Sequence, residues 1–531
     1  MNCGPIPCPE QNSPARVLRA QPAVRAPWVL VATILGSSMD YIDGTVVNVA
    51  LPSMQRSFSA TGTQLQWVVE AYALFLSSLL LTGGSLGDRF GRRKMFLCGV
   101  VLFACASLGC GIARHIGELL FARCLQGIGG ALLVPNSLAL LSGEFEGPAR
   151  AKAIGTWSGF SAVMTALGPV LGGWLVQHGS WRWAFFLNLP IAVMTVWVTL
   201  AKVPNPESPS QKSPLDTTGA FLVTASLACL TYSLLEWPTG HLASRVCGVV
   251  GLILLAIFVL AERRSRSPLI SLQLFLNRNF AGANLLTFLL YGALAATLFY
   301  LPLNLIQIQG YTPTQAGAAL LPFVFSMFFL SRWAGGLLQR WGARLPLILG
   351  PSITALGYLL LARPRVGGSY WMTYFPAIAI LGLGMTISVA PLTTVVMNSV
   401  DNEHSGMASG TNNAVSQIAA LLALALSAPL FFAEFSTALK QNLRSAHVSS
   451  ETSAQVRGQE RELGAIQTTD AQAREAIDDS FVAGFRLITL IAAGFAAAAG
   501  TTAMLTIRNQ PISREPERIP PDPISGLPAP R

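Results

Sequence analysis

The sequence predicts an all-α membrane protein with 14 transmembrane helices, and its composition and patterning lead to this fold class. Of its 531 residues, 52% are hydrophobic and only 11% are charged, whereas about a quarter of the residues in soluble domains are charged. The apolar residues form runs of about twenty or more, long enough to cross a lipid bilayer as helices. The basic residues behind the net charge of +10 fall in short gaps between these runs, so no continuous basic stripe predicts a nucleic-acid partner.

The apolar runs form two sets of six spans with one further pair between them. We expect the spans at 28–50, 64–86, 94–113, 115–141, 149–178, 181–202, 216–236, 244–262, 279–308, 313–337, 343–362, 371–397, 405–434 and 481–507. The predicted regions are an N-terminal tail at 1–27, a six-helix bundle at 28–202, an inserted two-helix region at 203–278, a second six-helix bundle at 279–507 that includes a long loop at 435–480, and a C-terminal tail at 508–531.

The distribution of Lys and Arg predicts how the chain crosses the membrane. Most short-loop basic residues, such as Lys94, Arg150 and Arg263, fall in one set of alternate loops. Cytoplasmic loops carry an excess of basic residues, and an even number of spans leaves both tails on one side. We therefore expect a multi-pass protein of the plasma (inner) membrane with both tails in the cytoplasm and the 435–480 loop outside.

One short loop carries the densest pattern in the chain. Residues 84–94 read GSLGDRFGRRK between two apolar runs. Its glycines allow a tight reversal and close helix packing, and its cations hold the turn at the cytoplasmic face. Residues 335–344, GGLLQRWGAR, repeat this frame with Gln339 in place of Asp88. The repeat predicts that the chain consists of two related halves.

Further motifs occur in order along the first half. They are IDGTVVNVALP at 42–52, LLFARCLQGIGG at 119–130, GPVLGG at 168–173 and SWRWAFFLNLP at 180–190. Together with the 84–94 loop, they resemble the fourteen-spanner drug:proton antiporter branch of the major facilitator superfamily. The resemblance implies a major facilitator fold of two six-helix bundles plus two inserted helices, and a small-molecule substrate site between the bundles. It also implies alternating access and the exchange of amphipathic, drug-like compounds for protons.

Four intramembrane charges are the predicted proton-coupling residues, namely Asp40, Asp43, Glu70 and Arg123. Asp40 and Asp43 are three residues apart on one helix face, and a carboxylate inside a membrane is costly enough to suggest function. From the rise per residue, Asp43 lies about 22 Å above the cytoplasmic end of its span, while Arg123 and Glu70 lie about 12 and 9 Å below the outer ends of theirs. The four groups thus share one depth. The simpler alternative is a static ion pair that only orients helices.

The loop and the fifth span supply two further predictions. The loop residues Gly84, Asp88, Arg89, Gly91 and Arg92 are expected to gate the cytoplasmic side, with Asp88 docking on the positive N-terminus of the helix that begins near residue 405. Its alternative is a turn that only sets topology.

The fifth-span residues Gly168, Pro169, Gly172 and Gly173 match the antiporter motif of the family, which accompanies exchange rather than symport. The alternative is ordinary close packing of small residues.

Aromatic residues within the spans are candidates to line a substrate cavity, and we single out Tyr41, Phe160, Tyr291 and Tyr300. Aromatic side chains that face lipid or fill the core are the alternative. The sequence does not predict an enzyme, because GGSLG at 83–87 ends a membrane helix instead of a strand. No phosphate-binding GxxxxGK[ST] sequence occurs and the five histidines are scattered, so we expect no cofactor and no metal site.

The leading expectation is a secondary active transporter that exports small amphipathic compounds in exchange for protons. An exporter of a lipid, siderophore or metabolite is the alternative within transport. A membrane sensor that keeps the fold without transporting is the alternative from another class.

Overall fold

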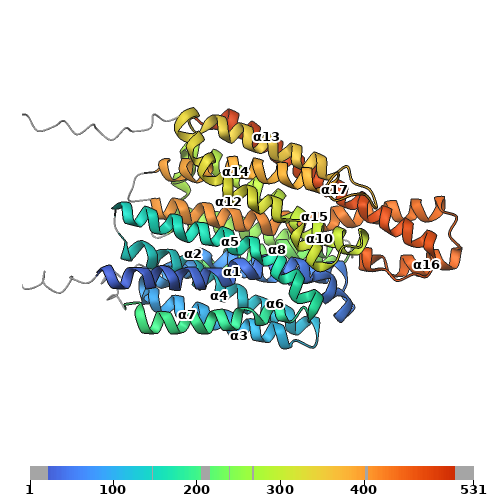
Figure 1. Cartoon of the computed structure of the whole chain (residues 1–531), viewed down its shortest axis with the longest axis horizontal. Coiled ribbons are helices and arrows are strands. Elements are labelled where there is room, and N and C mark those ends of the chain that lie inside the picture. The colour runs from blue at the N-terminus through green and yellow to red at the C-terminus, as the bar shows by residue number, and fades with distance from the viewer. Residues whose placement is uncertain are drawn as a thin grey trace, which may run out of the picture.

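The computed structural model describes residues 22–145, 147–204, 216–237, 240–265, 268–400 and 405–508, and these residues are helical without any strand. Long helices run side by side along one axis (Figure 1). The predicted tails at 1–27 and 508–531 lie almost entirely outside the described residues. We call the end where α1 begins and α17 finishes the terminal side, and the opposite end, where α16 lies, the α16 side (Figure 1).

The first half of the chain forms seven helices. They are α1 (Pro22–Phe58), α2 (Gly62–Phe90), α3 (Arg92–Ile112), α4 (Ile116–Glu144), α5 (Gly147–His178), α6 (Trp183–Phe186) and α7 (Asn188–Lys202). The inserted pair is α8 (Thr217–Leu235) and α9 (Leu242–Arg264).

The second half includes short helical turns between its long helices. Its elements are η3 (Leu272–Leu276), α10 (Arg278–Leu303), η4 (Asn304–Ile308), α11 (Pro313–Ala318), α12 (Leu321–Trp341), α13 (Arg344–Leu361), α14 (Tyr374–Asn398), α15 (Ser405–Ser445), α16 (Ser450–Gly458), η6 (Glu460–Ala465) and α17 (Ala471–Thr506).

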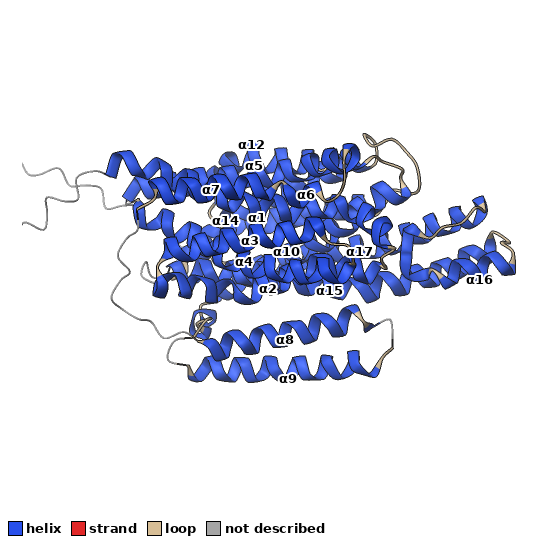
Figure 2. Ribbon diagram, turned by 90° about the horizontal axis from the view of Figure 1, so that it is seen from below, coloured by secondary structure: helices blue, strands red, loops and turns tan. Residues whose placement is uncertain are grey.

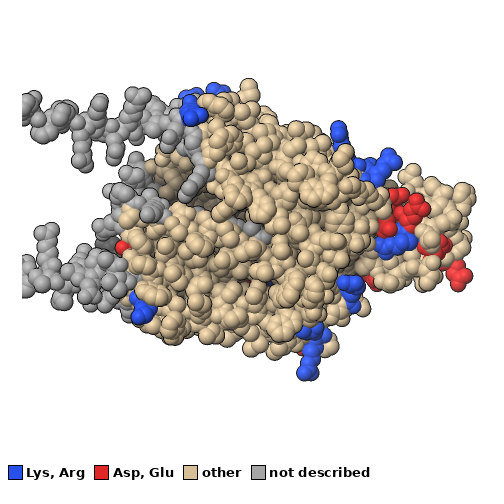
Figure 3. Space-filling view, in the orientation of Figure 1, with Lys and Arg blue, Asp and Glu red and all other residues tan. Residues whose placement is uncertain are grey.

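The predicted fold class is confirmed. Within the described residues, 13 helical segments are long and apolar enough to cross a membrane. α1 is not among them, although it is 37 residues long, and its middle carries Asp40 and Asp43. With α1, the 14 predicted spans all correspond to helices of the structure. A wide band free of charged side chains separates the charged residues at the two ends of the molecule, as expected for a membrane protein (Figure 3).

The structure refines three of the predicted segments. The sixth span breaks at Leu187 into α6 and α7, and the ninth ends in the π-helical turn η4. The predicted 435–480 loop is mostly helical, because α15 continues to Ser445 and α17 already begins at Ala471. These extensions, with α16 between them, project beyond the bundle on the α16 side (Figure 1).

Glycines allow the helices of the first half to pack with their backbones in contact. A Cβ atom on Gly83 of α2 would collide with the carbonyl group of Ala131 in α4, and one on Gly99 of α3 would lie 2.7 Å from the backbone nitrogen of Leu133. Such close approach is the usual way in which membrane helices gain packing energy, because lipid supplies no hydrophobic driving force between helices. The resulting bundle holds α2, α3 and α4 in fixed register.

The inserted pair α8–α9 packs against the bundle at the junction of the two halves. Val223 of α8 and Phe258 of α9 share an apolar cluster with Leu74 of α2 and Leu421 of α15. Figure 2 shows the pair lying along one side of the molecule. We call the interface between α1–α7 and α10–α17 the seam.

Candidate functional site

Asp43 lies at the centre of a buried polar network in the first half. Its Oδ2 accepts a hydrogen bond from Nη1 of Arg123 at 2.5 Å, and the side chains of the two residues are 0% and 1% exposed. α1 supplies the acid and α4 supplies the arginine. A buried ion pair is stable only if further hydrogen bonds satisfy the remaining polar atoms, and the surrounding residues supply them.

Gln126 and Asn188 complete the shell around Asp43. Gln126 Nε2 donates to Asp43 Oδ1 at 2.8 Å, and Gln126 Oε1 accepts from Arg123 Nη1 at 2.8 Å. Asn188 Nδ2 donates to the same Asp43 oxygen at 3.2 Å. Both amides also donate to Oγ of Ser107 in α3, at 2.9 and 3.2 Å. Helices α1, α3, α4 and α7 therefore meet at one carboxylate.

Sequence reasoning missed these two amides. Gln126 stands one turn after Arg123 in the 119–130 motif, and Asn188 lies in the 180–190 motif. Both motifs were used to identify the family, and their polar positions inside apolar spans were the signal that could have placed them in the network.

Asp40 joins the same cluster through an aromatic ring. The hydroxyl of Tyr72 donates to Asp40 Oδ1, and the Arg123 guanidinium lies 4.3 Å from the centre of the Tyr72 ring. Arg123 Nε also donates to the carbonyl oxygen of Val68 at 2.8 Å. The structure thus brings together three of the four predicted charges: Asp40, Asp43 and Arg123.

Glu70 does not join this cluster and lies on the seam. Its side chain is 0% exposed, and neither carboxyl oxygen has a hydrogen-bond partner among the described residues. A helix turns about 100° per residue, so Tyr72, which faces Asp40, and Glu70 point to nearly opposite sides of α2. Gln66, one turn before Glu70, donates to the hydroxyl of Tyr300 in α10 at 2.6 Å. Shared depth in the membrane therefore did not imply a shared site.

The glycine-rich segment 84–94 contains the end of α2 and the start of α3. Asp88 pairs with Arg92 at 2.8 Å, and the Asp88 side chain is exposed whereas that of Arg92 is partly buried. Gly91 has a φ of +101°, a conformation that suits glycine. A Cβ atom added to Gly84 would lie 3.6 Å from the side chain of Pro135 in α4.

The basic residues of this loop also bind helix ends nearby. Arg92 donates to the carbonyl oxygen of Ala139 at 3.3 Å, and Arg93 donates to that of Thr199 at 3.0 Å. Arg89 lies over the ring of Phe90 at 5.4 Å. The side chains of the first three residues of α15 lie outside the described part of the chain, so the predicted contact between Asp88 and this helix stays a prediction.

The fifth-span motif lies where the two halves touch. A Cβ atom on Gly168 would collide with Thr45 of α1, and one on Gly172 would lie 2.9 Å from the side chain of Val46. On the other face of α5, a Cβ on Gly173 would collide with the backbone of Pro313 in α11. The backbone of Pro169 packs against Gly317 of α11 in the same way. The motif therefore lets one helix contact both halves of the protein.

The four predicted aromatic residues do not share one wall. Tyr41 of α1 packs edge-on against Trp157 of α5 with ring centres 6.3 Å apart, whereas Tyr291 lies in α10 of the second half. Phe160 is exposed on α5. Tyr300 is buried and stacks on Phe431 of α15 with ring centres 4.4 Å apart.

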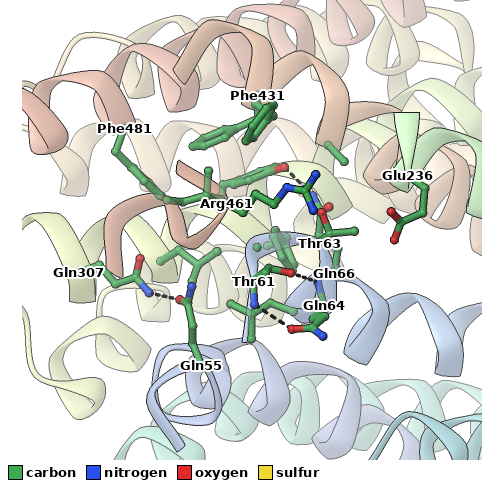
Figure 4. A pocket seen from close by; sticks show the side chains of 18 residues that line it. Gln55, Thr61, Thr63, Gln64, Gln66, Glu236, Gln307, Phe431, Arg461 and Phe481 are labelled. Atoms are coloured by element: carbon green, nitrogen blue, oxygen red, sulfur yellow. Dashed lines mark hydrogen bonds between the residues drawn. The ribbon is translucent and has the colours of Figure 1, made fainter. Parts of the chain in front are cut away.

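A cavity of about 210 Å³ lies in the seam on the α16 side. Its lining is aromatic on one side and rich in amides on the other, and Figure 4 shows these side chains. They include Gln55, Gln64, Gln66, Gln307, Phe299, Tyr300, Phe431, Phe481, Arg461 and Leu463. The cavity contains no cluster of three His, Cys, Asp or Glu residues placed to bind a metal, and neither does any other part of the described chain.

Contacts across the seam close this side of the protein. Gln307 Nε2 donates to Gln55 Oε1 at 2.7 Å (Figure 4), and Gln55 Nε2 donates to the carbonyl oxygen of Glu462 at 2.9 Å. Leu463 of η6 covers Gly62 closely enough that a Cβ there would lie 2.6 Å away. η6 thus reaches from the second half over the α1–α2 turn of the first.

The family model of the Major Facilitator Superfamily matches residues 33–424. The chain belongs to this superfamily. Among its relatives, the multidrug resistance protein Stp of Mycobacterium tuberculosis (strain CDC 1551 / Oshkosh) is 33% identical over 487 residues, covering 87% of this chain and 88% of Stp. The tetracenomycin C resistance and export protein of Streptomyces glaucescens is 29% identical and covers 96% of each chain. The puromycin resistance protein pur8 of Streptomyces alboniger is 33% identical and covers 76% of this chain and 82% of its own.

Solved structures of the superfamily share the fold. A bacterial homolog of the human lysosomal transporter Spinster, in an inward-facing and occupied conformation, superposes with a TM-score of 0.61 at 17% identity, covering 91% of this chain and 97% of that chain. An auto-inhibited peptide transporter of the POT family superposes with a TM-score of 0.63 at 13% identity, covering 92% and 98%. At such identities the likeness shows the fold alone.

The Asp43–Arg123 pair predicts a characteristic pattern of stabilities. Arg123→Gln leaves a buried carboxylate uncompensated and is expected to destabilise the protein by about 3–5 kcal/mol. The double variant Asp43→Asn/Arg123→Gln removes both charges and is expected to recover much of that loss. Thermal unfolding of the purified variants in one detergent gives the comparison. If the double variant is as unstable as the sum of its single variants, the two charges are not coupled.

Proposed function

We propose that this protein exports amphipathic, drug-like compounds in exchange for protons by alternating access. The observation that carries the proposal is the fully buried Asp43–Arg123 network, in which a carboxylate is held by groups that all belong to one half of the molecule. Its relatives carry the names of multidrug resistance and antibiotic export proteins, which supports drug-like cargo. The match of the superfamily model supports transport rather than enzymatic catalysis.

The network can carry a proton because Arg123 and burial favour opposite charge states of Asp43. Arg123 stabilises the ionised form of Asp43, whereas burial away from water favours the neutral form. When Asp43 takes up a proton, Arg123 loses its counter-charge, and the hydrogen bonds from Gln126 and Asn188 to the carboxylate weaken. A proton on Asp43 therefore changes the relative energies of the arrangements of α1, α3, α4 and α7, and this is how one bound proton can bias a two-state transporter.

The membrane orientation follows from the charge distribution. We assign the terminal side to the cytoplasm, because the basic loops, including 84–94, lie there. On this assignment the structure is closed toward the outside through the contacts of Gln55, Gln66 and Gly62. A substrate would enter between the halves from the cytoplasm and reach Tyr41 of α1 and Tyr291 of α10. The contacts of Gly168, Pro169, Gly172 and Gly173 are proposed to keep α5 sealed against α1 and α11 during the cycle.

The central prediction concerns Asp43. We expect Asp43→Asn to abolish proton-driven export, because the amide keeps the size of the side chain but cannot exchange a proton. The variant is expected to stay folded at lower stability, since Arg123 loses its counter-charge. Inside-out vesicles with an acidic interior are tested for accumulation of puromycin and tetracenomycin C. The wild type is expected to accumulate at least one compound about tenfold over Asp43→Asn, a difference of about 1.4 kcal/mol.

Glu118→Gln is the matched control, because Glu118 is an exposed acid in α4 that caps the backbone nitrogen of Arg114 at 2.7 Å and takes no part in the network. Full uphill accumulation by Asp43→Asn would contradict the coupling role. A wild type that moves no compound in a broad panel, lipids and siderophores included, would favour the membrane sensor.

We also propose that the 84–94 loop gates the terminal side. In this structure, closed on the α16 side, Asp88 pairs with Arg92. When the opposite side opens, Asp88 would dock on the N-terminus of α15, whose positive dipole stabilises an anion by about 1 kcal/mol. Arg89, Gly84 and Gly91 would set the shape of the turn that presents it.

The gate predicts faster access to the seam in Asp88→Asn. Gly410 of α15 lies beside Leu81 of α2, since a Cβ atom added to Gly410 would lie 3.3 Å from the Leu81 side chain. A cysteine at position 410 is expected to react with a permeant maleimide about fivefold faster in Asp88→Asn than in the wild-type loop, since about 1 kcal/mol is lost. Equal reaction rates combined with equal transport would leave the loop as a topological turn.

A further inference from the structure

We propose that Glu70 is a proton-operated latch for the α16 side of the seam, separate from the Asp43 network. In this proposal the seam closes over Glu70 only when the carboxyl group carries a proton, and it opens when the group is ionised and hydrated. The inference rests on the proposed function for its role in the transport cycle. Its geometry rests on the environment of Glu70 alone.

The first observation is the burial of an acid without a partner. The Glu70 side chain is 0% exposed, and both of its oxygens lack hydrogen-bond partners among the described residues. Asp43 is equally buried but accepts hydrogen bonds from Arg123, Gln126 and Asn188. Taking an unpaired carboxylate out of water costs several kcal/mol, which a carboxyl group avoids by remaining neutral. The closed seam therefore fits the protonated form of Glu70.

The second observation is the place of Glu70 in the fold. One turn earlier on the same face of α2, Gln66 donates to Tyr300 of α10 at 2.6 Å across the seam. Tyr300 also stacks on Phe431 of α15, with ring centres 4.4 Å apart. One turn after Glu70, Leu74 packs in one apolar cluster with Val223 of α8 and Leu421 of α15, so Glu70 lies between contacts of α2 with α10, α15 and the inserted pair. Separation of α2 from α10 and α15 would expose it, whereas the partners of Asp43 all move with the first half.

The groups around Glu70 leave it as the main titratable acid at this interface. α10 contributes Tyr300, and α8 contributes Tyr232 and, at its end, Glu236. Residues 408–433 of α15 contain no titratable side chain. Arg123 on α4 and Asp40 and Asp43 on α1 face the opposite side of α2, and η6 contributes Glu460, Arg461 and Glu462 at the outer rim. No cation among the described residues forms an ion pair with Glu70.

The direction of the pH effect follows from proton linkage. The closed seam binds one more proton than the open seam, so a rise in pH favours opening and a fall favours closure. With the α16 side outside the cell, an external proton would therefore let the emptied carrier close. Without that proton, closure of the α16 side would bury an ionised carboxylate. Glu70 would therefore oppose the return of the unprotonated carrier to the inward-open state.

The test measures seam opening directly, without substrate. All eight native cysteines are replaced by serine, and a spin-label pair is placed at Ser57, at the end of α1, and Ser369, in the loop before α14, both exposed on the α16 side. Distances are measured in lipid nanodiscs between pH 5.5 and 8.5. We expect the open-to-closed ratio to rise about tenfold or more across this range in the protein with Glu70, and to change less than twofold in Glu70→Gln, which stays mostly closed.

Three variants keep the result interpretable. Glu70→Asp keeps a titratable carboxyl group and should retain the pH response. Tyr300→Phe removes the hydrogen bond from Gln66 and should favour opening at every pH while retaining the response. Asp43→Asn should also retain it, so the latch can hold even if the proposed proton-driven export fails. A pH response of equal size in Glu70→Gln would overturn the proposal.

Discussion

The structure depends on one interaction, the ion pair that Asp43 and Arg123 form where water is absent. Removing two charged groups from water costs several kcal/mol for each ion. Their mutual attraction offsets this cost only when the remaining polar atoms of both groups find partners. Gln126 and Asn188 donate to Asp43, the backbone of Val68 accepts from Arg123, and the Tyr72 ring lies against the guanidinium. The geometry of the first half follows, because α1, α4 and α7 must all approach one carboxylate. The glycines of α2, α3 and α4 make such close approach possible.

The two kinds of buried acid differ in what a rocking motion does to them. The partners of Asp43 belong to one half, so a proton on Asp43 acts through a rearrangement of α1, α3, α4 and α7 within that half. Glu70 lies between contacts of α2 with the second half and the inserted pair, so in the proposed latch the rocking motion exposes it to water. A proton shifts the equilibrium between the two states of a transporter only if each state binds it with a different affinity. In the proposed cycle this difference arises at Asp43 from rearrangement within the first half and at Glu70 from opening of the seam.

The sequence predicted the spans well because length and apolar composition determine membrane crossing. The predicted segments 64–86 and 343–362 nearly coincide with α2 and α13. The helical extensions of α15 and α17 were predicted as a loop, because their polar residues resemble those of a solvated connection.

For the candidate site, Asp40, Asp43 and Arg123 came together as expected, whereas Glu70 did not. Depth along a helix can be counted from the sequence, but the direction of a side chain depends on how the helix is rotated against its neighbours. The amides of Gln126 and Asn188 were missed because a polar residue in an apolar span has no charge to mark it. The contact of η6 with the α1–α2 turn joins residues about 400 positions apart, and no local pattern predicts such a contact.

The most direct test of the central claim is to count the protons released when substrate binds. The comparison uses Glu70→Gln protein, with and without Asp43→Asn, in weakly buffered detergent with a pH-sensitive dye and a transported compound. The account predicts that the protein with Asp43 releases up to about one proton per molecule bound near the pH at which the site is half protonated, and that the double variant releases none. Equal proton release by both proteins would contradict the assignment of the exchanged proton to Asp43.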